Sequence, residues 1–152
     1  MRRLSLPDNG MSAETRRAIE ADCTRLINLY ANLNDAQDWP SVAQLYAEDA
    51  LFRRPSGGDP VVGREAILAS FLARAPRAQR HVIANTVVDV VSETEATAFS
   101  AIILYQGDLT DDGSLPAQSA NSPLVGWYRD RMVLTGEGWK FAERAGGLDF
   151  RP

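Results

Sequence analysis

The spacing of apolar residues divides the chain into a helical first half and a strand-rich second half. The first helix is expected to begin after Ser12, a typical N-capping residue, and to run for about two dozen residues. Its apolar side chains recur at helical spacing, at Ile19, Cys23, Leu26, Ile27, Tyr30 and Leu33. A second, short helix is expected after Asp38, and a third between Gly63 and Pro76. Residues 50–54 form a short strand pattern between these two helices.

Strand patterns dominate the second half of the chain. Apolar alternation and runs rich in Val, Ile, Phe, Tyr and Trp predict four strands, at residues 80–91, 95–107, 122–135 and 138–146. Helices followed by antiparallel strands predict an α+β domain in which the helices pack on one face of a curved sheet. The connection at residues 108–122 is long, and it could cover a cavity mouth or belong to an interface.

Length and composition indicate one domain. The chain has 152 residues, of which 45% are hydrophobic and 24% charged, as is typical of a globular protein with its own core. We expect a single domain at residues 12–150, preceded by a flexible arm at residues 1–11, with Met11 as an alternative start to Met1. Because no apolar run could span a bilayer or serve as a signal peptide, we expect a cytoplasmic protein with no membrane partner.

Charge and cysteine content argue against several classes of function. The net charge is −4 and the basic residues form no continuous stripe, so no nucleic-acid partner is expected. Cys23 is the only cysteine and occupies a core position, which excludes an internal disulfide and a cysteine metal cluster. No Gly-rich phosphate loop, nucleophile elbow or zinc-binding helix motif is present. We therefore expect no metal and no organic cofactor.

The only histidine, His81, lies in a predicted strand, and Asp35 lies where the first helix is expected to end. Imidazole exchanges protons readily near neutral pH, and a carboxylate partner fixes its tautomer and stabilises its charged form. A charged His81 would also offset the repulsion between Asp35 and the negative end of the helix dipole. These residue types predict a proton-transfer pair. The alternatives are a solvated or capping Asp35 and a strand histidine with no chemical role.

Several motifs in this order resemble the SnoaL-like branch of the nuclear-transport-factor-2-like superfamily. They are Leu26-Ile27-Asn28-Leu29-Tyr30, Asp35-Ala36-Gln37-Asp38-Trp39, Leu45-Tyr46-Ala47-Glu48-Asp49-Ala50, Gly63-Arg64-Glu65-Ala66-Ile67, Arg80-His81 with Asn85, and Gly138-Trp139-Lys140-Phe141. The resemblance covers residues 13–146. It implies a cone-shaped α+β barrel with three N-terminal helices packed on a strongly curved, mostly antiparallel sheet. The reaction stays open, because this fold carries isomerases, dehydratases, cyclases, hydrolases and non-catalytic members.

The resemblance also implies roles for individual residues. Scytalone-type and bile-acid-type dehydratases and a dehydrochlorinase of this branch carry an Asp–His pair inside the cone, and Asp35 and His81 match it. Tyr30 matches a tyrosine beside the pair in the bile-acid type. Gln106 stands where those dehydratases carry a carboxylate, which leaves the exact reaction open and argues against a steroid-isomerase mechanism. Arg144 matches an arginine near the C-terminal strand.

The remaining candidates are expected to contact a substrate. Phe52, Tyr105 and Trp127 would line the cavity or belong to the core, and Asn85 shares strand parity with His81. Arg144 has the opposite phase to the aromatic residues before it, so it faces inward only if a β-bulge intervenes.

The expected function is that of a cofactor-independent lyase or isomerase, chiefly a dehydratase, acting on a small, cyclic, mostly apolar molecule. Tyr30, Asp35 and His81 would be catalytic. The alternative is a non-catalytic binding or structural subunit, comparable to the small subunits of ring-hydroxylating oxygenases, which would copurify with a larger partner. Members of this superfamily commonly associate through the outer sheet face, so a homodimer or homotrimer is expected.

Overall fold

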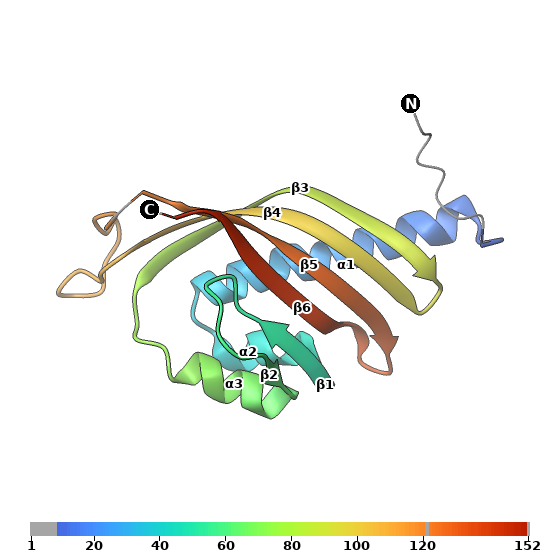
Figure 1. The fold of residues 1–152 in the computed structure, drawn as a ribbon, viewed down its shortest axis with the longest axis horizontal. Helices are drawn as coiled ribbons and strands as arrows, with labels where there is room; N and C mark the ends of the chain where they lie inside the picture. The colour runs from blue at the N-terminus through green and yellow to red at the C-terminus, as the bar shows by residue number, and fades with distance from the viewer. Residues whose placement is uncertain (1–8, 121, 152) are drawn as a thin grey trace.

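Long, curved strands cover the helices in the computed structural model, which describes residues 9–120 and 122–151 (Figure 1). The elements are α1 (Ala13–Asp35), α2 (Trp39–Gln44), β1 (Tyr46–Arg53), β2 (Val61–Val62), α3 (Arg64–Leu72), β3 (Ala78–Ser92), β4 (Glu95–Gly107), β5 (Leu124–Thr135) and β6 (Gly138–Phe150). They form one sheet in the order β2-β1-β6-β5-β4-β3, antiparallel except for the parallel pair of β1 and β6. The predicted α+β class, with helices on a curved and mostly antiparallel sheet, is confirmed.

Helix α1 places two candidate site residues near its C-terminal end. The Ser12 side chain caps the helix by accepting a hydrogen bond from the Thr15 N–H at 3.0 Å. The apolar stripe predicted from the sequence is buried except for the half-buried Leu33, and the thiol of Cys23 is fully enclosed, which raises its pKa to about 12. Cys23 is therefore a neutral core residue. The helix ends at Asp35, one and a half turns after Tyr30.

The segment between β1 and α3 contains the short strand β2 and a glycine turn directly before α3. Gly63 has a φ of 94°, which side chains other than glycine rarely adopt, and α3 begins directly after it. Strand β2 was not predicted from the sequence, because two residues are too few to show alternation. It pairs with Leu51 and Phe52 of β1.

Bulges in β3 and β6 reverse which residues face the core. The pairing of β3 with β4 shifts between Ala84 and Val87, and Asn85 within this bulge has a positive φ of 52°. The pairing of β6 with β5 shifts next to Phe141, and both Phe141 and Arg144 are then buried. A strand of uniform alternation would have turned one of those two outward.

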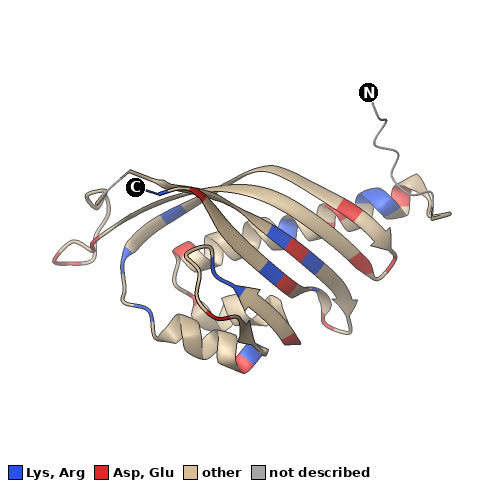
Figure 2. Ribbon diagram, viewed as in Figure 1, with Lys and Arg blue, Asp and Glu red and all other residues tan. Residues whose placement is uncertain are grey.

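Most of the arm expected at residues 1–11 lies outside the described residues. Within the described part, the Asn9 side chain donates a hydrogen bond to the Val91 carbonyl and accepts one from Arg16. None of the described helices is long and apolar enough to cross a membrane. Positive and negative residues are interspersed over the ribbon, including along β5 and β6 (Figure 2).

Candidate active site

A cavity of about 390 Å³ lies between the C-terminal end of α1 and the inner face of the sheet. Side chains from both α1 and α2 and from β1, β3, β4, β5 and β6 line it, together with the chain segments that follow α1, β1 and α3. Apolar residues such as Ile102 and Leu104 supply part of the wall, and arginine, amide and hydroxyl groups supply the rest. A cavity that combines apolar wall with convergent polar groups is a typical form of a small-molecule site.

His81 and Asp35 meet at the wall of this cavity. His81 Nδ1 lies 2.5 Å from Asp35 Oδ1, and the His81 backbone N–H donates to Asp35 Oδ2 at 2.9 Å. The two side chains are only 7% and 4% exposed. Since both carboxylate oxygens are engaged, the carboxylate is fixed in place, and Nε2 is the ring nitrogen of His81 left for the cavity. Arg80 adds a weaker contact, 3.7 Å from Asp35 Oδ2.

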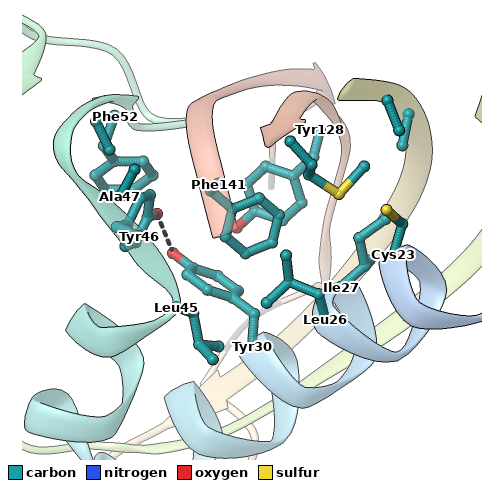
Figure 3. Close-up of a cluster of buried hydrophobic side chains, with 14 of the residues drawn as sticks. Cys23, Leu26, Ile27, Tyr30, Leu45, Tyr46, Ala47, Phe52, Tyr128 and Phe141 are labelled. Atoms are coloured by element: carbon teal, nitrogen blue, oxygen red, sulfur yellow. Dashed lines mark hydrogen bonds between the residues drawn. The ribbon is translucent and has the colours of Figure 1, made fainter. Parts of the chain in front are cut away.

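Tyr30 lies on the same cavity and forms part of a buried cluster of aromatic rings (Figure 3). The Tyr46 hydroxyl donates to the Tyr30 hydroxyl at 3.2 Å. Burial raises the pKa of Tyr46 well above its usual value, so Tyr46 stays neutral. Because Tyr30 accepts this bond, its own hydrogen is free to be donated. Tyr46 was not predicted to take part in the site, and the sequence analysis named it only within the motif Leu45-Tyr46-Ala47-Glu48-Asp49-Ala50.

Arg144 lies behind the tyrosines and does not line the cavity. Its guanidinium carbon is 3.8 Å from the centre of the Tyr128 ring and 4.2 Å from that of Tyr30. Arg144 Nε lies 3.1 Å from Asp130 Oδ1 in a pair that is fully buried, although the angle is too poor for a hydrogen bond. Burial raises the pKa of Asp130 to about 6, although Arg144 acts in the opposite direction. The bulge in β6 explains this inward position.

The other predicted contacts divide between the two faces of the sheet. Phe52 and Gln106 line the cavity, and Gln106 accepts a hydrogen bond from Arg77 Nη1 at 3.0 Å. Tyr105 is 47% exposed on the outer face, and Trp127 packs there against Gly147 and Arg129. The predicted face was wrong for Tyr105 and Trp127, because both faces of their strands carry aromatic or apolar residues. The residues next to them in the sequence, Leu104, Gln106 and Tyr128, line the cavity instead.

Asn85 and the long connection also lie away from the cavity. The bulge in β3 ends the alternation that would have carried Asn85 to the same face as His81, and Asn85 is exposed. None of the described residues between Asp108 and Ser122 lines the cavity. The sequence analysis missed Tyr128, which does line the cavity and whose signal was its alternation with Trp127. No group of three or more potential metal-ligating side chains occurs among the described residues.

Comparisons with known proteins support the fold. A protein from Novosphingobium aromaticivorans described as a candidate scytalone dehydratase is 22% identical, with a TM-score of 0.76 over 91% of this chain and 89% of its own. An NTF2-like protein with a cystatin-like fold from the same organism is 21% identical, with a TM-score of 0.72 over 97% and 94%. A protein from Catenulispora acidiphila in complex with S-DNPA is 23% identical, with a TM-score of 0.69 over 88% and 95%.

No curated protein matches the sequence significantly. The family profile of the SnoaL-like domain, however, matches residues 15–145, which include most of α1 with Tyr30 and Asp35, the whole of β3 to β5 and most of β6. The resemblance inferred from the sequence motifs is thereby confirmed, and the chain belongs to the SnoaL-like domain family.

Proposed function

We propose that the protein is a cofactor-independent lyase, chiefly a dehydratase, that removes a C–H proton from a cyclic substrate with His81 as the base. The observation that carries this proposal is the contact between His81 Nδ1 and Asp35 Oδ1 at the cavity wall. A carboxylate accepting the Nδ1 hydrogen leaves Nε2 unprotonated and stabilises the imidazolium that forms when Nε2 takes a proton. The structural relative described as a candidate scytalone dehydratase is consistent with this class of reaction.

The reaction would be an elimination of water next to a carbonyl group. His81 Nε2 takes the acidic proton, the electrons of the C–H bond form the C=C bond, and the C–O bond to the leaving group breaks. The proton then passes from His81 to the departing hydroxide, so water leaves and the imidazole returns to its starting form. A positioned base of this kind contributes about 10²–10⁴-fold to the rate.

Tyr30 would stabilise the negative charge that develops on oxygen. Its hydroxyl accepts a hydrogen bond from Tyr46, which polarises the remaining O–H bond and leaves that hydrogen for the substrate carbonyl or the departing oxygen. The surrounding rings exclude water from the pair of hydroxyls, which strengthens both hydrogen bonds. Phe52, Gln106 and Tyr128 would position the ring of the substrate.

The base-promoted ring opening of 5-nitrobenzisoxazole tests the proposal without knowledge of the natural substrate. A base removes the C–H proton of this small cyclic probe, the N–O bond breaks, and a coloured phenolate forms. We expect saturable turnover by the wild-type protein, because the probe must enter the cavity to reach His81. A rate no greater than that of the same concentration of free imidazole would reject the proposed base.

The tautomer of His81 gives a second, independent prediction. In Asp35→Asn, the side-chain oxygen must still accept the His81 backbone N–H, which turns the new NH₂ group toward Nδ1. Nδ1 then becomes an acceptor and Nε2 carries the hydrogen. Long-range ¹H–¹⁵N correlation spectra of the single histidine should show the Nδ1–H tautomer in the wild type and the Nε2–H tautomer in Asp35→Asn. The same tautomer in both proteins would contradict the proposed role of Asp35.

The proposal includes association of two or three copies through the outer face of the sheet. Several large apolar side chains are exposed there, among them Val82, Val87, Phe99 and Tyr105. Contiguous exposed apolar surface is typical of a protein interface.

A further inference from the structure

The permanently charged side chains in the cavity wall are all arginines. Arg54, Arg74 and Arg77 line it, and no aspartate or glutamate is among its lining residues. The chain as a whole carries a net charge of −4, so the cavity has the opposite sign to the protein around it. A cavity of one sign within low-dielectric walls concentrates ligands of the other sign.

Arg74 is held in position without using its hydrogen-bond donors. It is half-buried after the end of α3, and its guanidinium carbon lies 4.2 Å from the centre of the Phe71 ring and 5.7 Å from that of Trp39. The Trp39 and Phe71 rings are themselves stacked, with centres 5.3 Å apart. No hydrogen bond or ion pair joins the Arg74 guanidinium to any other described side chain or backbone group. Stacking therefore orients this cation, and its N–H groups remain for a ligand.

Arg54 brings a second cation to the same wall. One of its terminal nitrogens donates to the Ser70 carbonyl at 3.1 Å, while its Nε is buried and has no hydrogen-bond partner among the described residues. Burial lowers the pKa of Arg74, and the neighbouring Arg54 lowers it further. Two like charges kept close together in a partly desolvated wall are unfavourable until an anion joins them.

We propose that the cavity selects a cyclic substrate bearing a carboxylate, held by Arg74 and Arg54. The inference deepens the proposed function, and rests on it for the claim that the ligand of this cavity is a substrate. A planar guanidinium matches a carboxylate in shape and charge, and the aromatic rings under Arg74 fix the approach of the anion. The ring of the substrate would extend from this carboxylate toward Tyr30 and His81, which line the same cavity.

Equilibrium binding of two probes tests this inference. 2-Naphthoate and its neutral counterpart 2-naphthamide have the same ring system, and isothermal titration calorimetry would measure both. We expect the wild-type protein to bind 2-naphthoate about ten- to hundredfold more tightly than 2-naphthamide, since a charge-assisted hydrogen bond contributes that much. The preference should shrink as the salt concentration is raised. Equal affinity for the two probes, or no binding of 2-naphthoate, would overturn the inference.

Single substitutions show which arginines cause the preference for 2-naphthoate over 2-naphthamide. Arg74→Met retains an unbranched side chain for stacking on Phe71 and removes the charge, so the preference should fall at least fivefold while the affinity for 2-naphthamide changes little. Arg54→Gln should also reduce the preference for 2-naphthoate, and this variant remains informative if Arg74→Met does not fold. Arg53→Gln is the matched control, because Arg53 is exposed and does not line the cavity. An unchanged preference in both cavity variants would overturn the assignment.

The two experiments, binding of 2-naphthoate and opening of 5-nitrobenzisoxazole, test the carboxylate site and the proposed base independently. If 5-nitrobenzisoxazole were not opened but the preference for 2-naphthoate held, the cavity would bind carboxylates without the proposed base chemistry. If ring opening occurred and no preference for 2-naphthoate existed, the proposed base would stand and the substrate would be uncharged.

Discussion

His81→Gln is expected to slow the opening of 5-nitrobenzisoxazole by about 10²–10⁴-fold, the usual contribution of a positioned general base. Glutamine is similar in size to histidine, and its amide can still donate to Asp35 Oδ1, so the cavity wall should keep its shape. An amide cannot take up a proton near neutral pH. The loss should therefore appear in kcat, with KM changing little, in steady-state kinetics followed by the absorbance of the phenolate.

Two comparisons separate the base from a merely structural histidine. His81→Ala should lose the same activity, and added imidazole should restore part of it by occupying the vacated space. If His81→Gln kept the wild-type rate and only His81→Ala lost it, the side chain would be acting through its shape, and the proposed base would be abandoned. Near-ultraviolet circular dichroism would confirm that each variant is folded.

The sequence predicted the helices well because the relevant signals are local, whereas the pairing of Asp35 with His81 was expected from their residue types and from the family resemblance. Ser12 marked the start of α1, the apolar stripe marked its buried face, and the end of that stripe placed Asp35 at the helix terminus. Asp35 and His81 then meet because α1 packs against β3. Each of the signals in α1 lies within a few residues of the feature that it predicts.

The face of each strand was harder to predict, because bulges have little sequence signal. Asn85 and Arg144 both lie beside a shift in pairing, and each is found on the face opposite to the one that simple alternation gives. The predicted face of Tyr105 and Trp127 was wrong for a second reason. Their strands carry large apolar or aromatic residues on both faces, so hydrophobicity alone cannot decide which residue faces the cavity.

The buried Arg144 contacts the rings of Tyr30 and Tyr128, which line the cavity, and its loss should have a large effect on stability. We expect Arg144→Met to lower the free energy of unfolding by about 3–5 kcal/mol near neutral pH, because Asp130 would be left as a buried charge without its cation. Two tyrosine rings would also lose the cation stacked on them. Urea unfolding followed by tryptophan fluorescence would measure the change.

The stability lost in Arg144→Met should depend on pH, and the pKa of Asp130 determines whether the loss grows or shrinks as the pH rises. That pKa is raised to about 6 in the folded protein, against 3.8 for an unperturbed carboxyl group, so folding favours the neutral form. The folded protein therefore gains stability relative to the unfolded chain as the pH falls from about 6 toward about 4. Arg144→Met removes the group that lowers this pKa and should raise it further. The destabilisation should thus be smaller at about pH 5, where Asp130 is largely protonated in both proteins, than at about pH 8.

A double variant distinguishes this electrostatic cause from a packing defect. Asp130→Leu/Arg144→Met removes both charges and fills the site with apolar groups, so it should recover most of the stability that Arg144→Met loses. If the double variant were as unstable as Arg144→Met, or if the loss in Arg144→Met were equal at both pH values, shape rather than charge would account for the effect. A double variant that is stable but slow in ring opening would show that the buried cation also acts on Tyr30, whose ring centre lies 4.2 Å from the guanidinium carbon.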